Sequence, residues 1–159
     1  ATAPAAGTPN YHQGHGRVDM GRAIPNASRP NLVLEFSDDW TPGSGLKTGQ
    51  NARFQVTVPD GCEELRACLT FTDPPARGLQ NNLNVVVQRG GDVRKYLGNE
   101  AVPDALSLPD TTNNLECVRI PKPPAGVYYI QVMASNVLQA PQAFALVVTG
   151  DGLSGFGPY

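Results

Sequence analysis

The chain has 159 residues, of which 40% are hydrophobic and 16% charged, and its formal net charge is −2. This length suits one domain with a core and short appendages. The charge balance offers no electrostatic footprint for nucleic acid or an anionic membrane. No apolar run approaches the roughly 20 residues of a membrane-spanning helix.

The N-terminal region is predicted to be a linker followed by a short helix. Residues 1–15 are polar and rich in Gly and Pro, without the basic start and apolar stretch of a signal peptide. A secreted form would then carry its signal upstream. Residues 16–24 can form about two helical turns with Val18, Met20 and Ile24 as apolar members, and Pro25 ends them.

From residue 31 onward the hydrophobic period changes from that of a helix to two. Alternating runs cover residues 32–36, 54–58, 65–71, 83–87, 94–97, 115–120, 127–135 and 143–149. Because alternate side chains of a strand lie on opposite faces, each run offers one apolar face to a shared core. The pattern predicts an all-β fold, an antiparallel β-sandwich or jelly-roll-like barrel of about eight strands with one short N-terminal helix.

The phase of each run predicts which side chains point inward. In the first run, Leu32, Leu34 and Phe36 form the apolar phase. The later runs predict that the core is lined by Leu69, Phe71, Val85, Val87, Ile130, Val132 and Leu146.

Residues able to support catalysis are scarce. The two histidines, His12 and His15, lie in the Gly-rich N-terminal region, and no Gly-x-Ser-x-Gly string occurs. We therefore predict no catalytic residues in this chain and favour solvated histidines over a His12–His15 metal site. Trp40 could serve as a sugar-binding platform, but a rim residue covering one end of the sandwich is the favoured interpretation.

Three cysteines permit one disulfide. Cys68 and Cys117 lie on the outward phase of their strands, so they can pair only if those strands are neighbours. A Cys62–Cys68 bridge requires the chain to double back before the strand begins. We favour Cys62–Cys68.

An ordered series of short strings resembles the C-terminal part of subtilisin-like (subtilase) serine proteases of the alkaline, oxidatively stable type. The N-terminal Gly14-His-Gly16-Arg-Val18 looks like the Gly-x-Gly-x-Val segment that ends their catalytic domain. The strings that resemble their C-terminal β-barrel are LRACLTFTDPP (65–75), NNLNV (81–85), YLGN (96–99), DTTNNLE (110–116), GVYYIQV (126–132) and PQAFAL (141–146). Together the strings span residues 10–150 in the family's order.

The resemblance implies a division of the chain and a function. Residues 1–28 would be the end of the catalytic-domain region plus a linker, residues 29–150 a jelly-roll-like β-sandwich domain, and residues 151–159 a C-terminal tail. The family's catalytic Ser, His and Asp lie upstream, so this chain would be inactive alone. It would be a non-catalytic accessory domain of a secreted or periplasmic hydrolase, with that protein's catalytic domain as its partner. Neither nucleic acid nor a membrane span is implied.

A free-standing extracellular module that binds carbohydrate or a protein surface is the alternative. The short helix discriminates the two. In a protease its apolar side chains complete the core of another domain, whereas in a free module they should pack on the sandwich itself.

The resemblance also implies a calcium site in the polar region between residues 98 and 116. Candidate oxygen ligands are Asn82, Asn84, Asn99, Asp110, Asn113 and Glu116. Glu116 shares the inward phase of Val118 and Ile120, and a buried carboxylate must be paired, hydrogen-bonded or bound to a metal. The alternative is a purely structural network, in which Glu116 accepts hydrogen bonds from the loop at 98–112 or from Arg94 and the asparagines cap turns.

Overall fold

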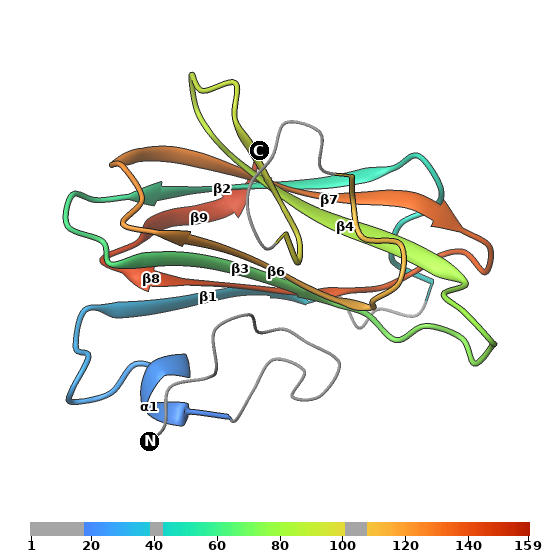
Figure 1. Ribbon diagram of the computed structural model, residues 1–159, viewed down its shortest axis with the longest axis horizontal. Helices are drawn as coiled ribbons and strands as arrows, with labels where there is room; N and C mark the ends of the chain where they lie inside the picture. Colours follow the sequence, from blue (N-terminus) through green and yellow to red (C-terminus); the bar gives the residue numbers. More distant parts are fainter. Residues whose placement is uncertain (1–17, 39–42, 101–107) are drawn as a thin grey trace.

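A computed structural model describes residues 18–38, 43–100 and 108–159. These residues form two antiparallel sheets that face one another as a sandwich (Figure 1). Sheet 1 has the strand order β1-β8-β3-β6, and sheet 2 has the order β5-β4-β7-β2-β9. The strands are β1 (Leu32–Asp38), β2 (Asn51–Val58), β3 (Glu64–Thr70), β4 (Asn81–Arg89), β5 (Lys95–Leu97), β6 (Leu115–Pro121), β7 (Gly126–Val137), β8 (Ala145–Asp151) and β9 (Ser154–Pro158). The all-β prediction is confirmed.

The core lies between the sheets, where the inward phases of the strands meet. All seven side chains predicted to line it are buried. Burial follows the expected period of two, as in β3, where Leu65, Ala67 and Leu69 are buried and the intervening residues are not. Burying alternate side chains of both sheets removes their apolar surface from water, which is the main term favouring this fold.

Strand β7 offers a matched test of this core. Val132 is fully buried, whereas Val127 on the opposite face of the same strand is 38% exposed. We expect Val132→Ala to lower the free energy of unfolding by about 2 kcal/mol, since it deletes two buried methyl groups. Val127→Ala should change it by less than about 0.5 kcal/mol, as is usual for exposed sites. Equal denaturation midpoints for the two variants would contradict the assigned strand phase.

Two predicted segments differ from the structure at the ends of the chain. The helix α1 spans only Met20–Ala23, one turn rather than two (Figure 1). No described helix is long and apolar enough to cross a membrane. At the other end, the predicted tail contains β9, which pairs with β2 and stacks Phe156 on Phe54 at 5.6 Å between ring centroids. Residues 151–159 thus belong to the sandwich.

The predicted phase of the first strand is right at Leu32, which is buried, and wrong at Phe36. Phe36 pairs with Val147 of β8 and faces outward, with 66% of its surface exposed. The inner face of β1 carries Val33 and Glu35. Glu35 pairs with Val148 of β8, which is fully buried. Apolar residues occupy both phases of β1, so the period alone does not select a face, and pairing with β8 decides it.

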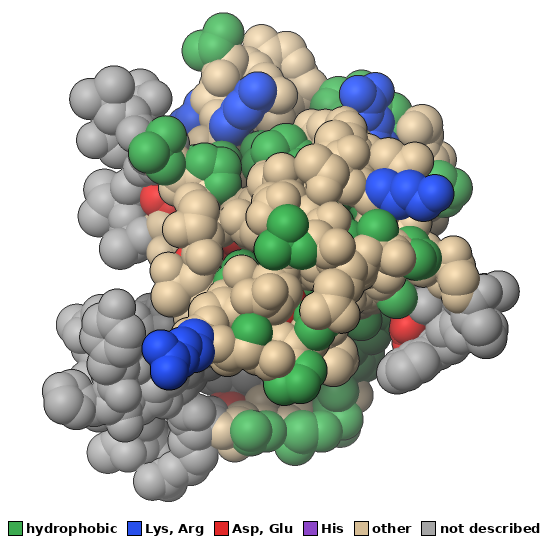
Figure 2. All heavy atoms as spheres, turned by 90° about the vertical axis from the view of Figure 1, so that its right-hand side faces the viewer, with side chains coloured by type: hydrophobic (Ala, Val, Ile, Leu, Met, Phe, Trp, Pro, Cys, Tyr) green, Lys and Arg blue, Asp and Glu red, His purple; other side chains and the backbone are tan. Residues whose placement is uncertain are grey.

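At one end of the sandwich, the described side chains that reach the surface are of mixed type. Figure 2 shows the right-hand end of Figure 1, where apolar side chains are scattered among polar groups and backbone. Lys and Arg side chains lie around the margin of this view, and acidic side chains barely reach its surface.

Candidate functional site

The side chains predicted as calcium ligands are divided among three places. Asn99, Asp110 and Asn113 form a hydrogen-bonded cluster in the chain between β5 and β6. Asn82 and Asn84 lie on β4 and bond to one another. The sixth, Glu116, lies inside the sandwich on β6.

The Asp110 carboxylate is the centre of the first cluster. Its Oδ1 accepts hydrogen bonds from the backbone N–H groups of Thr112 and Asn113, at 2.7 and 3.2 Å. Its Oδ2 accepts from the amide Nδ2 atoms of Asn99 and Asn113, at 2.8 and 2.6 Å. Partial burial raises the pKa of Asp110, but these four donors outweigh it, and the pKa lies below its ordinary value. Asp110 is thus an ionised turn-capping acceptor at neutral pH.

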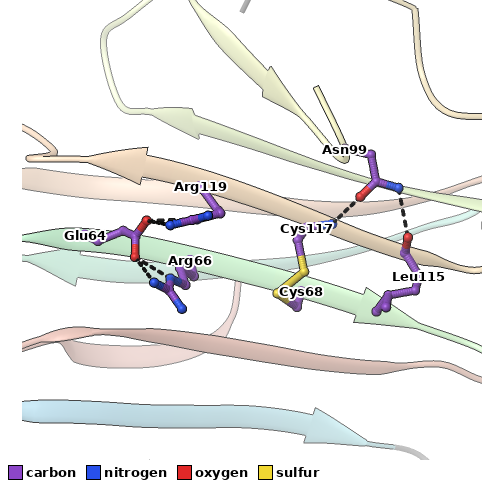
Figure 3. Close-up of a disulfide and its surroundings, with 7 residues drawn as sticks. All are labelled: Glu64, Arg66, Cys68, Asn99, Leu115, Cys117 and Arg119. Atoms are coloured by element: carbon purple, nitrogen blue, oxygen red, sulfur yellow. Dashed lines mark hydrogen bonds and ion pairs between the residues drawn. A yellow bond between two sulfur atoms is a disulfide. The ribbon is translucent and has the colours of Figure 1, made fainter. Parts of the chain in front are cut away.

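Asn99 holds the outer edge of β6 in place of a further strand. Its backbone N–H donates to the carbonyl of Cys117 (3.0 Å), and its Oδ1 accepts from the N–H of the same residue (3.1 Å). Its Nδ2 also donates to the carbonyl of Leu115 (2.9 Å), as Figure 3 shows. Asn99 has a φ of 60°, a left-handed conformation that asparagine tolerates better than most residues. These contacts satisfy backbone groups that an edge strand would otherwise expose.

Glu116 is fully buried between the two sheets. Its Oε2 accepts a hydrogen bond from the backbone N–H of Val85 on β4 (2.8 Å), which ties the edge of sheet 1 to sheet 2. Its Oε1 has no hydrogen-bond partner among the described residues. Burial raises the pKa of Glu116 to about 8, with the hydrogen bond from Val85 lowering it and the nearby Asp110 charge raising it further. The carboxyl is therefore largely protonated at neutral pH.

Gly98 makes room for this carboxyl. A Cβ atom at Gly98 would lie 2.2 Å from Glu116 Oε2 and 2.7 Å from its Cβ. The Gly98 N–H also donates to the carbonyl of Val85 (3.0 Å), so the same β4 residue contacts both groups. The donor found for Glu116 is the amide of Val85 on β4, whereas the sequence predicted the loop at 98–112 or Arg94.

The asparagines of β4 make a separate network. The Nδ2 of Asn84 donates to Asn82 Oδ1 (3.0 Å) and to Ser135 Oγ (2.9 Å) on the neighbouring strand β7. Next to them, Asn81 donates to Gln142 Oε1 at 2.7 Å and to the carbonyl of Gln139. These bonds join β4 to β7 and to the chain that follows it, away from the Asp110 cluster.

Hydrogen bonds within the protein engage most of the candidate calcium ligands. Calcium takes six to eight oxygen ligands. Both asparagines of the Asp110 cluster turn their NH₂ groups towards the carboxylate, and Asn99 Oδ1 is occupied by the Cys117 N–H. Across residues 18–38, 43–100 and 108–159, no three His, Cys, Asp or Glu residues are grouped as a metal site. The calcium site stays a prediction, and the hydrogen-bonded network is the arrangement seen among the described residues.

We accordingly expect the melting temperature to be the same in millimolar calcium and in EDTA. Asp110→Asn should lower the free energy of unfolding by about 1 to 3 kcal/mol in both solutions, because four charge-assisted hydrogen bonds are weakened. Thermal melts followed by circular dichroism measure both effects. A calcium-dependent rise in melting temperature that Asp110→Asn abolishes would restore the calcium site.

The predicted Cys62–Cys68 bridge is wrong. Cys68 of β3 is bonded to Cys117 of β6, while Cys62 is a buried free thiol (Figure 3). The two strands are neighbours, and the register places Cys68 directly opposite Cys117 with 4.2 Å between Cα atoms. Both backbone groups of Cys117 bond to Asn99, so the two cysteines form a non-hydrogen-bonded pair, the closer kind in an antiparallel ladder. Burial raises the pKa of the Cys62 thiol.

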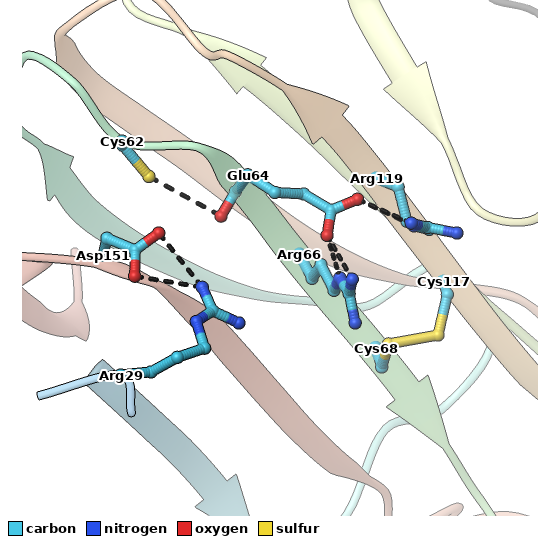
Figure 4. A network of polar contacts seen from close by, with 8 residues as sticks. All are labelled: Arg29, Cys62, Glu64, Arg66, Cys68, Cys117, Arg119 and Asp151. Carbon is cyan, nitrogen blue, oxygen red and sulfur yellow. Dashed lines mark hydrogen bonds and ion pairs between the residues drawn. A yellow bond between two sulfur atoms is a disulfide. The ribbon is translucent and has the colours of Figure 1, made fainter. Parts of the chain in front are cut away.

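Ion pairs flank the disulfide on the outer face of sheet 1. Glu64 contacts both Arg66 and Arg119, with 2.8 Å to Arg119 Nη2, and Figure 4 shows the three side chains over neighbouring strands. Arg29 donates two hydrogen bonds to Asp151, at 3.0 and 3.1 Å, which fasten the chain before β1 to the end of β8. Partly exposed pairs of this kind contribute little stability and mainly fix local geometry.

Beyond the predicted site residues, the structure reveals an apolar row on this face. The row consists of Phe36 on β1, Val147 on β8 and the Cys68–Cys117 disulfide on β3 and β6, which the registers place side by side. We call it the sheet 1 outer row. Sequence reasoning missed it because it assigned Phe36 to the core. Three other residues noted from the sequence, His12, His15 and Trp40, lie outside the described residues.

Comparisons with known proteins give a similarity of low identity. No protein-family model matches it. The chain is 24% identical over 156 residues to the serine protease/ABC transporter B family protein tagA of Dictyostelium discoideum. The match covers 91% of this chain and 9% of that protein, so the chain spans less than a tenth of the relative's length. The molecule is thus a β-sandwich with low similarity to part of a protein named as a serine protease.

Proposed function

We propose that this chain is a non-catalytic accessory domain of a secreted, subtilisin-like serine peptidase, whose catalytic domain it stabilises or shapes. The observation that carries the proposal is the state of the N-terminal segment. Val18 is 80% exposed and Met20 57%, and Ile24 is exposed as well. Apolar side chains of a free-standing module should pack on its own sandwich, and these do not.

Exposed apolar side chains are common on proteins when they occur singly. Here three of them fall within seven residues, which begin at the last residue of the string that resembles the end of a subtilase catalytic domain. Apolar side chains that do not pack on the sandwich would be buried if they completed the core of the preceding domain, which explains their exposure here. The low similarity to a protein named as a serine protease supports the same class.

The disulfide supports secretion. Disulfides persist in oxidising compartments and are rare in the cytosol. The Cys68–Cys117 bridge fits an extracellular or periplasmic address for the domain. Under this proposal, the Ser, His and Asp that cleave peptide bonds belong to the preceding domain.

The test uses the full open reading frame that encodes this chain. Its purified product should hydrolyse casein, and a serine-directed inhibitor should abolish that activity. The isolated chain should show no hydrolysis. Deleting residues 29–159 should shorten the half-life of the peptidase at elevated temperature while inhibitor-sensitive hydrolysis remains measurable at the start of the incubation.

A full-length product without inhibitor-sensitive hydrolysis would contradict the proposal. So would a truncated enzyme that loses activity on heating no faster than the parent. Tight binding of a polysaccharide by the isolated chain would instead favour the free-standing module.

A further inference from the structure

We infer that the outer face of sheet 1, centred on Phe36 and Val147, is the surface that packs against the preceding catalytic domain. The identity of this partner rests on the proposed function. The location of the surface rests on the exposure, register and chemistry of the residues themselves.

The sheet 1 outer row crosses all four strands without a polar side chain. Phe36 pairs with Val147, Val147 lies opposite Cys68, and Cys68 is bonded to Cys117. Phe36 is 66% exposed in the middle part of its strand, and Val147 is also exposed. An outward position of a sandwich strand usually carries a polar residue, so a row of this kind marks a covered surface.

Strand β2 of sheet 2 shows the usual outward pattern of a sandwich strand. On β2 the side chains that alternate with the buried Phe54, Val56 and Val58 are polar. They are Asn51, Arg53, Gln55 and Thr57. Elsewhere on this face, β7 carries the exposed Val127, so sheet 2 is not uniformly polar. Sheet 1 is distinguished by its edge strand β1, which follows the N-terminal segment in the chain.

The surroundings of the row resemble the rim of a protein interface. The ion pairs of Glu64 with Arg66 and Arg119 lie on the same face, and Arg29 with Asp151 lies at its end (Figure 4). Interfaces combine an apolar centre with a polar, partly hydrated rim. Aromatic side chains near the centre carry much of their binding energy, which makes Phe36 the expected anchor.

Continuity with the N-terminal segment identifies the occupant. Asn26 holds the carbonyls of Gly21 and Ile24, a bridge joins Asn26 to Arg29, and Arg29 is paired with Asp151 on sheet 1. The exposed apolar side chains before Pro25 are thereby fastened to the end of the same sheet. A domain that receives Val18 and Met20 is held by the chain at the start of β1, the strand that carries Phe36. This covalent linkage raises the effective concentration of the catalytic domain at the surface of sheet 1. A small contact area is therefore enough to keep the two domains packed together.

Hydroxyl-radical footprinting of the full-length protein tests the surface directly. Oxidation of Phe36 and Met20, read by mass spectrometry, should be several-fold slower in the native full-length protein than after truncation to this chain. Tyr159 is 54% exposed at the far end of the chain and should react at the same rate in both. Unchanged oxidation of Phe36 in an active full-length peptidase would overturn the inference while leaving the proposed function intact.

A matched pair of variants gives a second readout. Phe36→Glu in the full-length protein should shorten the half-life of thermal inactivation about tenfold, equivalent to about 1.4 kcal/mol of interface free energy. Val127→Glu, on the outer face of sheet 2, should leave the half-life unchanged. Equal half-lives for the two variants would overturn the inference, whether or not both fold.

Two further outcomes separate this inference from its alternatives. A full-length protein without inhibitor-sensitive hydrolysis would remove the proposed partner, and footprinting would still report whether the face is covered. Sedimentation could instead show a dimer, with Phe36 protected only in that dimer. If Phe36→Glu abolished the dimer without changing the half-life, the face would be assigned to a second copy, which would overturn the occupant named here.

Discussion

Replacing Glu116 by glutamine should remove most of the decline in stability of this domain between about pH 5 and pH 8. The folded-state pKa of Glu116 is raised from 4.5 to about 8, mainly by burial between the sheets. The native protein therefore keeps this proton at pH values where the unfolded chain has released it. The free energy of unfolding that the protonated Glu116 contributes is fully present below the pKa of the unfolded state. It is lost as the pH rises through the pKa of the folded state.

The expected size of the effect follows from the linkage relation. Each pH unit between the two pKa values corresponds to about 1.4 kcal/mol, so the loss approaches about 5 kcal/mol above pH 8. Glu116→Gln mimics the protonated carboxyl in shape and can still accept the hydrogen bond from Val85. The variant should thus match the parent near pH 4 and exceed it at pH 9.

Urea unfolding at several pH values, with the free energy extrapolated to water, measures this difference. Glu63→Gln is a suitable control, because Glu63 is exposed and its replacement leaves the buried carboxyl in place. Asp110 has a lowered pKa, so its contribution is lost only as pH falls through that value, on the acid side of the profile. Parallel profiles for parent and Glu116→Gln across the alkaline range would show that Glu116 ionises as an exposed carboxyl does.

The alternation of apolar residues was sufficient to predict the core because most strands bury one face only. At least one sequence neighbour is polar for each of Val85, Val87, Ile130 and Val132. The structure buries all four. Where a strand is apolar in both phases, as β1 is at Leu32, Val33 and Leu34, the sequence left the face undetermined. There the pairing of Phe36 with Val147 decided it.

The candidate site was less predictable, because it depends on contacts between segments distant in the sequence. The oxygen-rich residues were identified, but the direction of their amide groups was not. Asn99 bonds to Cys117, 18 positions away, and Glu116 to Val85, 31 positions away. The order Gly98-Asn99 was a signal for a left-handed turn, but only the position of β6 shows which edge that turn covers.

The largest covalent contribution to stability should come from the Cys68–Cys117 disulfide. It joins β3 to the edge strand β6 across a sequence separation of 49 residues, a segment that contains β4 and β5. A bridge closing a loop of this length lowers the entropy of the unfolded chain. Chain-entropy estimates put its contribution at about 4 kcal/mol. The double variant Cys68→Ala/Cys117→Ala should lose roughly that amount.

Chemical denaturation of the double variant measures the loss, and Cys62→Ala provides the matched control. Cys62 is a buried thiol outside the bridge, so its truncation should cost only about 1 kcal/mol. Reducing agent should destabilise the parent and Cys62→Ala alike and leave the double variant unaffected. Peptide mapping without reduction should recover the Cys68 and Cys117 peptides linked. A linked peptide containing Cys62, or a double variant as stable as the parent, would contradict this pairing and the neighbouring positions of β3 and β6 from which it follows.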